Sequence, residues 1–171
     1  MKTTNDNIPL TASLLAPRSE LNFLHSANAV ISNEWSAFRL YCFMTAGTPK
    51  WLKGAFTVRD KISQHFNVEK IGGFSGKTPE QAPVVGEKLD FFTVQAISDQ
   101  KLVLTSRDSH LAVMVSIDLI GQDVREVFIT TSVKTFNTFG RLYMLPVAPA
   151  HGAIIKFMLA RLPQAPSSKS A

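Results

Sequence analysis

The sequence predicts an α+β fold in which a curved antiparallel sheet packs against a long C-terminal helix. Residues 100–137 alternate between apolar and polar side chains, which is the pattern of half-buried strands joined by short turns. Residues 139–162 then form one long and very apolar helical segment. A sheet with one apolar face needs a covering element. We therefore expect this helix to lie in the concave face of the sheet, an arrangement that often encloses a pocket.

Length and composition indicate one domain. The chain has 171 residues, of which 45% are hydrophobic, and twelve of them are Phe, so a substantial core is available. We place the domain at residues 20–162, with a polar N-terminal arm at 1–19 and a flexible tail rich in Pro, Ser and Ala at 163–171. A single cysteine, Cys42, rules out an internal disulfide and lies in an apolar run typical of a buried thiol.

The formal net charge of +5 comes from 18 basic and 13 acidic residues. The basic residues are scattered along the chain, form no continuous run and accompany no nucleic-acid motif, so we expect no nucleic-acid partner. A solvated surface explains them, and weak attraction to anionic lipid headgroups is the alternative.

Two segments bear on location. Residues 1–18 lack the apolar stretch of a secretory signal, which favours the cytoplasm. Residues 142–160 approach the length of a membrane span, but they contain Pro146, Pro149, His151, Gly152 and Lys156. A kinked helix buried in the protein fits this composition better, so we expect no stable membrane insertion.

The elements before the sheet are a strand and two helices. Residues 21–31 have the pattern of a first strand, and Ser32 or Asn33 can cap a helix that begins near Glu34. Gly47 ends that helix, and Pro49 can occupy the first turn of a second helix that runs to about His65.

Strands follow at 89–97, 102–106, 111–119 and 126–136, and a further short strand is expected at 68–74, which gives a sheet of six or seven strands. Gly and Pro residues between 72 and 83 mark a long loop. Pro149 can start the main part of the closing helix.

Three segments resemble a known family. Pro49–Leu52 with Val58–Asp60 is similar to its second-helix pattern, and Arg107–Leu111 is similar to its His-Leu turn into a strand. Phe139–Tyr143 with Pro149–His151 and Met158-Leu159 resembles its C-terminal pattern. The family is the bacterial domain-of-unknown-function family 2867, within the START-like (SRPBCC) superfamily of helix-grip folds. The resemblance spans residues 20–162 and implies a curved sheet wrapped around the C-terminal helix, with two helices inserted after the first strand.

The chain departs from this family at two places. Ala112, Val113 and Met114 stand where the family often has Asp and Arg flanking an aromatic residue, and Ala150 replaces an aromatic residue before His151. Polar chemistry built on that Asp/Arg pair is therefore absent here. The resemblance implies a fold and a cavity, and it implies no reaction.

Few residues carry chemistry of their own. His110 follows a turn and precedes a buried strand, so it either lies at a cavity rim or hydrogen-bonds the turn near Asp108. Arg141 could meet a carboxylate or phosphate of a ligand, or hold the helix to a strand carbonyl. The four histidines show no ligand spacing, so we expect no metal, and no cofactor is expected either. No partnering base or nucleophile is evident beside His110, so we assign no catalytic residue and favour a protein that is not an enzyme.

Three functions remain open. The first is binding of a small hydrophobic or amphipathic molecule, such as a lipid, between sheet and helix. The second is a cyclase- or hydrolase-like enzyme that uses the same cavity, with His110 or Asp108 as general acid or base. The third is a protein-interaction module, including a homodimer. The residues expected to line the pocket are Trp51, Phe56, His110, Val113, Val115, Ile129, Arg141, Tyr143 and Met158.

Overall fold

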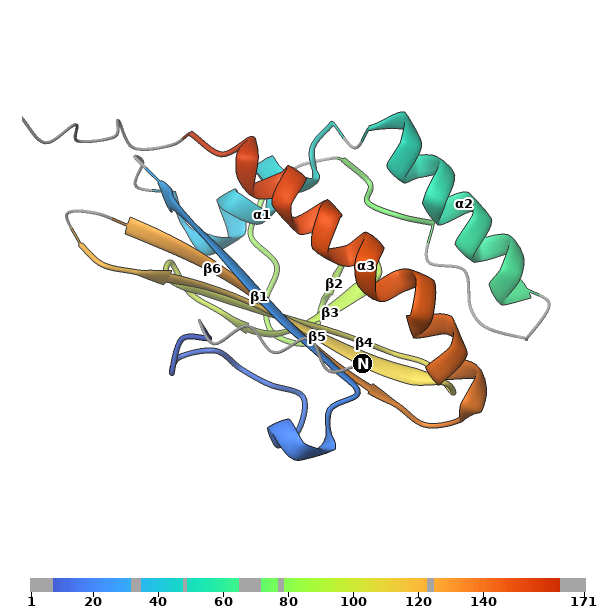
Figure 1. Ribbon diagram of the computed structural model, residues 1–171. Coiled ribbons are helices and arrows are strands. Elements are labelled where there is room, and N and C mark those ends of the chain that lie inside the picture. The colour runs from blue at the N-terminus through green and yellow to red at the C-terminus, as the bar shows by residue number, and fades with distance from the viewer. Residues whose placement is uncertain are drawn as a thin grey trace, which may run out of the picture.

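The described residues form one six-stranded antiparallel sheet with three α-helices on one side, which confirms the α+β fold class (Figure 1). The computed structural model describes residues 8–31, 35–47, 49–64, 72–76, 79–122 and 125–163. The strands are β1 (Phe23–Ile31), β2 (Lys88–Leu89), β3 (Phe92–Ile97), β4 (Lys101–Arg107), β5 (Leu111–Ile120) and β6 (Arg125–Thr135), arranged in the order β1-β6-β5-β4-β3-β2. The helices are η1 (Arg18–Glu20), α1 (Ala37–Thr45), α2 (Lys50–Gln64) and α3 (Thr138–Ala160).

The apolar face of the sheet is the one that the three α-helices cover (Figure 1). Alternation places Val113, Val115 and Ile117 of β5 on this face, directly opposite Val133, Thr131 and Ile129 of β6. The alternation in the sequence therefore predicted the inward face correctly for both strands. Burial of these side chains against the helices is the main favourable term that holds the two layers together.

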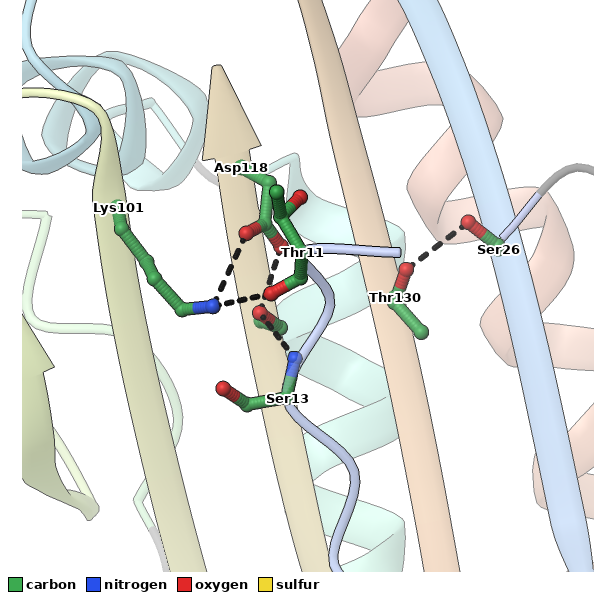
Figure 2. A network of polar contacts seen from close by, with 7 residues as sticks. Thr11, Ser13, Ser26, Lys101, Asp118 and Thr130 are labelled. Atoms are coloured by element: carbon green, nitrogen blue, oxygen red, sulfur yellow. Dashed lines mark hydrogen bonds and ion pairs between the residues drawn. The ribbon is translucent and has the colours of Figure 1, made fainter. Parts of the chain in front are cut away.

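The opposite face of the sheet carries both polar and apolar side chains, and the N-terminal arm crosses it (Figure 2). Ser13 N donates to Ser116 Oγ over 3.1 Å, and Leu15 N donates to Ser132 Oγ over 3.0 Å. Lys101 Nζ donates to the carbonyl oxygen of Thr11 and lies 3.2 Å from Asp118 Oδ1. Polar side chains of this face thus pair with the arm backbone, so the arm contacts the sheet between Thr11 and Leu15.

Two predicted boundaries are wrong. The strand expected at 89–97 is divided into β2 and β3 because Asp90 adopts a left-handed backbone with φ of 54°. Its carboxylate accepts from Tyr41 Oη at 2.6 Å and from Ser75 N at 2.8 Å, which fixes this turn. Helix α1 begins at Ala37 rather than near residue 34, because Ser36 is extended and its Oγ accepts from Arg39 N. Residues 72–76 form no strand, and 68–71 lie outside the described residues.

The closing helix also starts earlier than predicted. Asn137 caps α3, its Oδ1 accepting from Gly140 N at 2.9 Å, and the helix continues through Pro146 and Pro149. Both prolines lie on the exposed side, where the carbonyls that lose a hydrogen-bond partner can turn toward water. The start predicted at Pro149 is therefore wrong.

Helix α3 is buried along one stripe only. Ile155, Met158 and Leu159 pack into the core, whereas Leu142 and Leu145 are 60% and 67% exposed. The expectation of a buried helix is therefore wrong for its outward side. Among the described residues α3 is the one helix long and apolar enough to cross a membrane, a property that core helices of globular proteins share.

The start of α3 is held against the turn between β4 and β5. Phe136 N donates to His110 O at 2.7 Å, and Asn137 Nδ2 lies 2.7 Å from His110 Nδ1. A Cβ atom at Gly140 would lie 2.4 Å from the same His110 carbonyl oxygen, so only glycine allows this approach. These contacts join the segments Arg107–Leu111 and Phe139–Tyr143.

We expect Gly140→Ala to destabilise the protein by about 1–3 kcal/mol, because the added methyl group must displace backbone rather than a flexible side chain. Gly54→Ala in α2 is the matched control, since a Cβ there meets nothing within 4 Å and alanine favours helix. Urea denaturation of the two variants checks the difference. Equal unfolding free energies would show that the approach of α3 to His110 is not tight.

Candidate functional site

Three polar side chains meet between the middle of α3 and the apolar face of the sheet. His25 of β1 and Thr131 of β6 are direct partners in the strand register, and both are buried. His151 of α3 lies above them, its ring centroid 5.6 Å from that of His25 in an edge-on arrangement. The ring of Phe23 lies 5.6 Å from His151 and 6.3 Å from His25. We name His25, Thr131 and His151 the buried polar cluster.

Burial keeps both imidazoles of the cluster neutral. It lowers the pKa of His151 to about 4, with a further contribution from nearby His25. Burial also lowers the pKa of His25, helped by the positive charge of Lys156. A neutral imidazole has one N–H donor and one nitrogen acceptor, so each ring can serve either kind of partner group.

The cluster has unused hydrogen-bonding capacity. Five buried side-chain atoms of the described residues find no hydrogen-bond partner, and all lie on the helix-facing side: His25 Nδ1, Thr131 Oγ1, His151 Nε2, His110 Nε2 and Thr135 Oγ1. On the outer face, by contrast, buried Ser116 donates to Asp118 at 2.6 Å and Ser26 pairs with Thr130 at 2.9 Å. Because an unpaired buried polar group is costly, any molecule that offered hydrogen bonds to these atoms would be favoured here.

The sheet next to the cluster is incompletely covered. Val113 and Val115 lie on the helix-facing side of the central strand β5, yet both are only half-buried. Tyr143 and Val147, in the N-terminal half of α3, are also half-buried, whereas Ile155 and Met158 in the C-terminal half are buried. The sheet is therefore covered more completely under the C-terminal half of α3 than under Tyr143 and Val147 in its N-terminal half.

His110 has a structural role in addition to any contact with a ligand. Its Nδ1 must accept from Asn137 Nδ2, because an amide nitrogen can only donate, so the ring proton sits on Nε2. Asp108 Oδ1 accepts from the backbone N–H groups of His110 and Leu111, at 2.7 and 3.0 Å. Both side chains named in the enzyme hypothesis thus shape the turn that holds α3.

The remaining residues predicted for the pocket lie in several places. Ile129 and Met158 are buried in the core, and Tyr143 lies near the ring of Phe139. Phe56 belongs to an aromatic group with Phe74 and Phe91, at centroid distances of 5.5 and 6.2 Å. Arg141 is exposed on α3. The side chain of Trp51 lies outside the described residues.

The sequence prediction missed His25, Thr131 and His151. One signal could have identified two of them: in a strand of alternating side chains, His25 and Thr131 share the inward face with Phe23 and Ile129. Their proximity to His151 depends on how α3 crosses the sheet, which no spacing encodes. No group of three or more His, Cys, Asp or Glu side chains suitable for a metal occurs among the described residues.

We expect Thr131→Val to raise the free energy of unfolding by about 1 kcal/mol, because it removes a buried hydroxyl without a partner and keeps the shape of the side chain. Thr130→Val is the matched control on the same strand. It should destabilise by about 1 kcal/mol, because it removes the hydrogen bond between Thr130 and Ser26. Thermal and urea unfolding of both variants check the opposite signs, and destabilisation by both would contradict an unpaired Thr131.

Stability should depend on pH through His151. The unfolded chain takes up a proton near pH 6.5 and the folded chain only near pH 4, so the unfolded state binds more protons between these values. The free energy of unfolding should therefore decrease as the pH falls from about 6.5 to about 4, with a loss on the order of 2–3 kcal/mol from this group. Denaturation series of the wild type and His151→Leu measure it. The variant should lose less stability over this interval, and parallel curves would contradict the assignment.

Comparison with known proteins adds a family and two solved structures. No curated protein matches the chain. The Mll3558 protein from Rhizobium loti is similar at 11% identity, with 81% of this chain and 96% of that chain covered and a TM-score of 0.42. The hypothetical protein jhp0584 from Helicobacter pylori is similar at 11% identity, with 90% and 98% covered and a TM-score of 0.41.

The family comparison is more extensive. The model of the family described as "Protein of unknown function (DUF2867)" matches residues 20–158, which include the whole sheet and nearly all of α3. This match confirms the family resemblance found in the sequence. The chain therefore belongs to the DUF2867 family.

Proposed function

We propose that this protein binds a small amphipathic molecule between the N-terminal half of α3 and the sheet. The observation that carries the proposal is the buried polar cluster, whose atoms Thr131 Oγ1, His25 Nδ1 and His151 Nε2 are without partners in an apolar layer. Binding sites for small molecules are typically apolar with a few convergent polar groups. We infer, consistently with this, that the fold is a helix-grip of the START-like kind and that the protein acts in the cytoplasm.

The strand register supports a specific orientation of the ligand. Val115, Thr131 and His25 are consecutive neighbours across β5, β6 and β1, and His151 lies over His25. A molecule that enters over the half-buried Val115 would meet Thr131 first and the histidines next. Its apolar part would rest on Val113 and Val115, and its polar group would pair with the buried polar cluster.

The electrostatics of the cluster favour a neutral polar group. A carboxylate would lose its hydration among two neutral imidazoles and a hydroxyl, which give it no full positive charge in direct contact. A hydroxyl, carbonyl or amide group loses less and can exchange donors and acceptors with all three side chains. We therefore expect alcohols, ketones or amides with a small apolar body to bind better than fatty acids.

Native mass spectrometry after incubation with total lipid extract tests the proposal. The wild-type protein should retain a small molecule, whereas Val115→Phe should not, because the larger ring fills the incompletely covered region. Thr131→Val should bind about tenfold more weakly through loss of its hydroxyl, and Thr130→Val should bind like the wild type. Absence of a bound species, or equal retention by Val115→Phe, would overturn the proposal.

A further inference from the structure

The helix layer of the fold is rich in basic residues and nearly free of acidic ones. Helices α1, α2 and α3 contain seven basic residues and one acidic residue, a net charge of +6. The rest of the chain contains the other eleven basic and twelve acidic residues, a net charge of −1. All three helices lie on the same side of the sheet, so together they bring an excess of positive charge to that side (Figure 1). The basic residues of the helices are Arg39, Lys50, Lys53, Arg59, Lys61, Arg141 and Lys156.

The outward side of α3 is apolar although it faces away from the sheet. Its exposed positions recur at helical spacing and include Leu142, Leu145, Pro146 and Pro149, followed by Phe157, which is 37% exposed. No acidic residue occurs anywhere in α3, and its two basic residues, Arg141 and Lys156, are exposed toward either end of this surface. We name Arg141, Leu142, Leu145, Lys156 and Phe157 the outer face of α3.

We propose that the outer face of α3 docks the protein onto an anionic lipid surface. Exposed leucines flanked by lysine and arginine suit the boundary between headgroups and acyl chains, where the apolar side chains enter and the cations pair with lipid phosphates and carboxylates. The helix would lie flat in this boundary, because Ile155, Met158 and Leu159 on its other side remain packed in the protein core.

The charge and the exposed leucines of the helix layer favour an anionic lipid surface over two other partners, a second copy of the chain and a nucleic acid. A second copy of the chain would bring one helix layer with a net charge of +6 against another, which opposes association through this face. A nucleic acid would satisfy the charge but would gain nothing from Leu142 and Leu145, which are 60% and 67% exposed. An anionic membrane surface accounts for both the charge and the leucines. Docking through the outer face of α3 would not involve the buried polar cluster, which lies on the other side of the helix.

Flotation with vesicles of phosphatidylcholine, with and without phosphatidylserine, tests this docking. The wild-type protein should float with the phosphatidylserine vesicles, and added salt should weaken the binding by screening. Arg141→Gln/Lys156→Gln should bind roughly tenfold or more weakly, since each cation near an anionic surface contributes on the order of 1 kcal/mol. Arg18→Gln/Lys88→Gln is the matched control, because it removes the same charge from exposed positions outside the three α-helices.

The contribution of the leucines is measured separately. Leu142→Ser/Leu145→Ser should reduce vesicle binding about tenfold or more while unfolding like the wild type, because both side chains are exposed. Val84→Ser/Val85→Ser removes two equally exposed apolar residues from a loop and should bind like the wild type. Failure to bind phosphatidylserine vesicles would overturn the proposal, as would unchanged binding by the leucine variant.

Two further measurements separate the competing partners. Binding to duplex DNA as tight as to vesicles and unaffected by the serine substitutions would assign the face to nucleic acid and overturn the proposal. Light scattering that shows a dimer, dissociated by Leu142→Ser/Leu145→Ser, would assign it to a second copy and overturn it as well. A monomer in solution that binds only the anionic vesicles would support the proposal.

Discussion

The start of α3 is held by a close approach between Gly140 and the carbonyl oxygen of His110. A side chain at position 140 would collide with that oxygen, and the cap by Asn137 is linked to His110 through a hydrogen bond of 2.7 Å. The turn between β4 and β5 thus sets where the helix begins. Packing of Ile155, Met158 and Leu159 in the core holds the other end, and between these two ends His151 lies against His25. Two segments that carry the family resemblance meet at this point, which gives their residue types a physical reason.

The two faces of the sheet differ in how fully their buried polar side chains are hydrogen-bonded. The face of the sheet that the N-terminal arm crosses buries four polar side chains, Ser116, Asp118, Thr130 and Ser132. The arm and other residues of the sheet supply hydrogen-bond partners to them, so their burial costs little (Figure 2). The helix-facing side buries fewer polar groups and leaves several unpaired. Proteins accept such a cost mainly where binding or another function repays it. The binding proposal therefore rests on the side of the sheet that is less well satisfied.

Much of the fold could be predicted because the responsible signals are local. Period-two alternation identified β5 and β6 and their inward faces, and the apolar run identified α3. The errors have local causes as well: the left-handed backbone of Asp90 divides a predicted strand, and Asn137 starts a helix that was assigned to Pro149. Of the candidate site, the sequence predicted the half-buried Val113 and Val115 but missed His25, Thr131 and His151.

The sequence by itself determined the class of the fold, the inward faces of β5 and β6 and the family. These properties depend on residue type and spacing along the chain, which are local quantities. Only the tertiary structure decided that two histidines 126 positions apart face each other, that the three helices with a net charge of +6 share one layer, and that the outward side of α3 stays exposed. Each of these depends on how one element is placed on another. That placement is fixed by packing between segments distant in the chain, which no local pattern records.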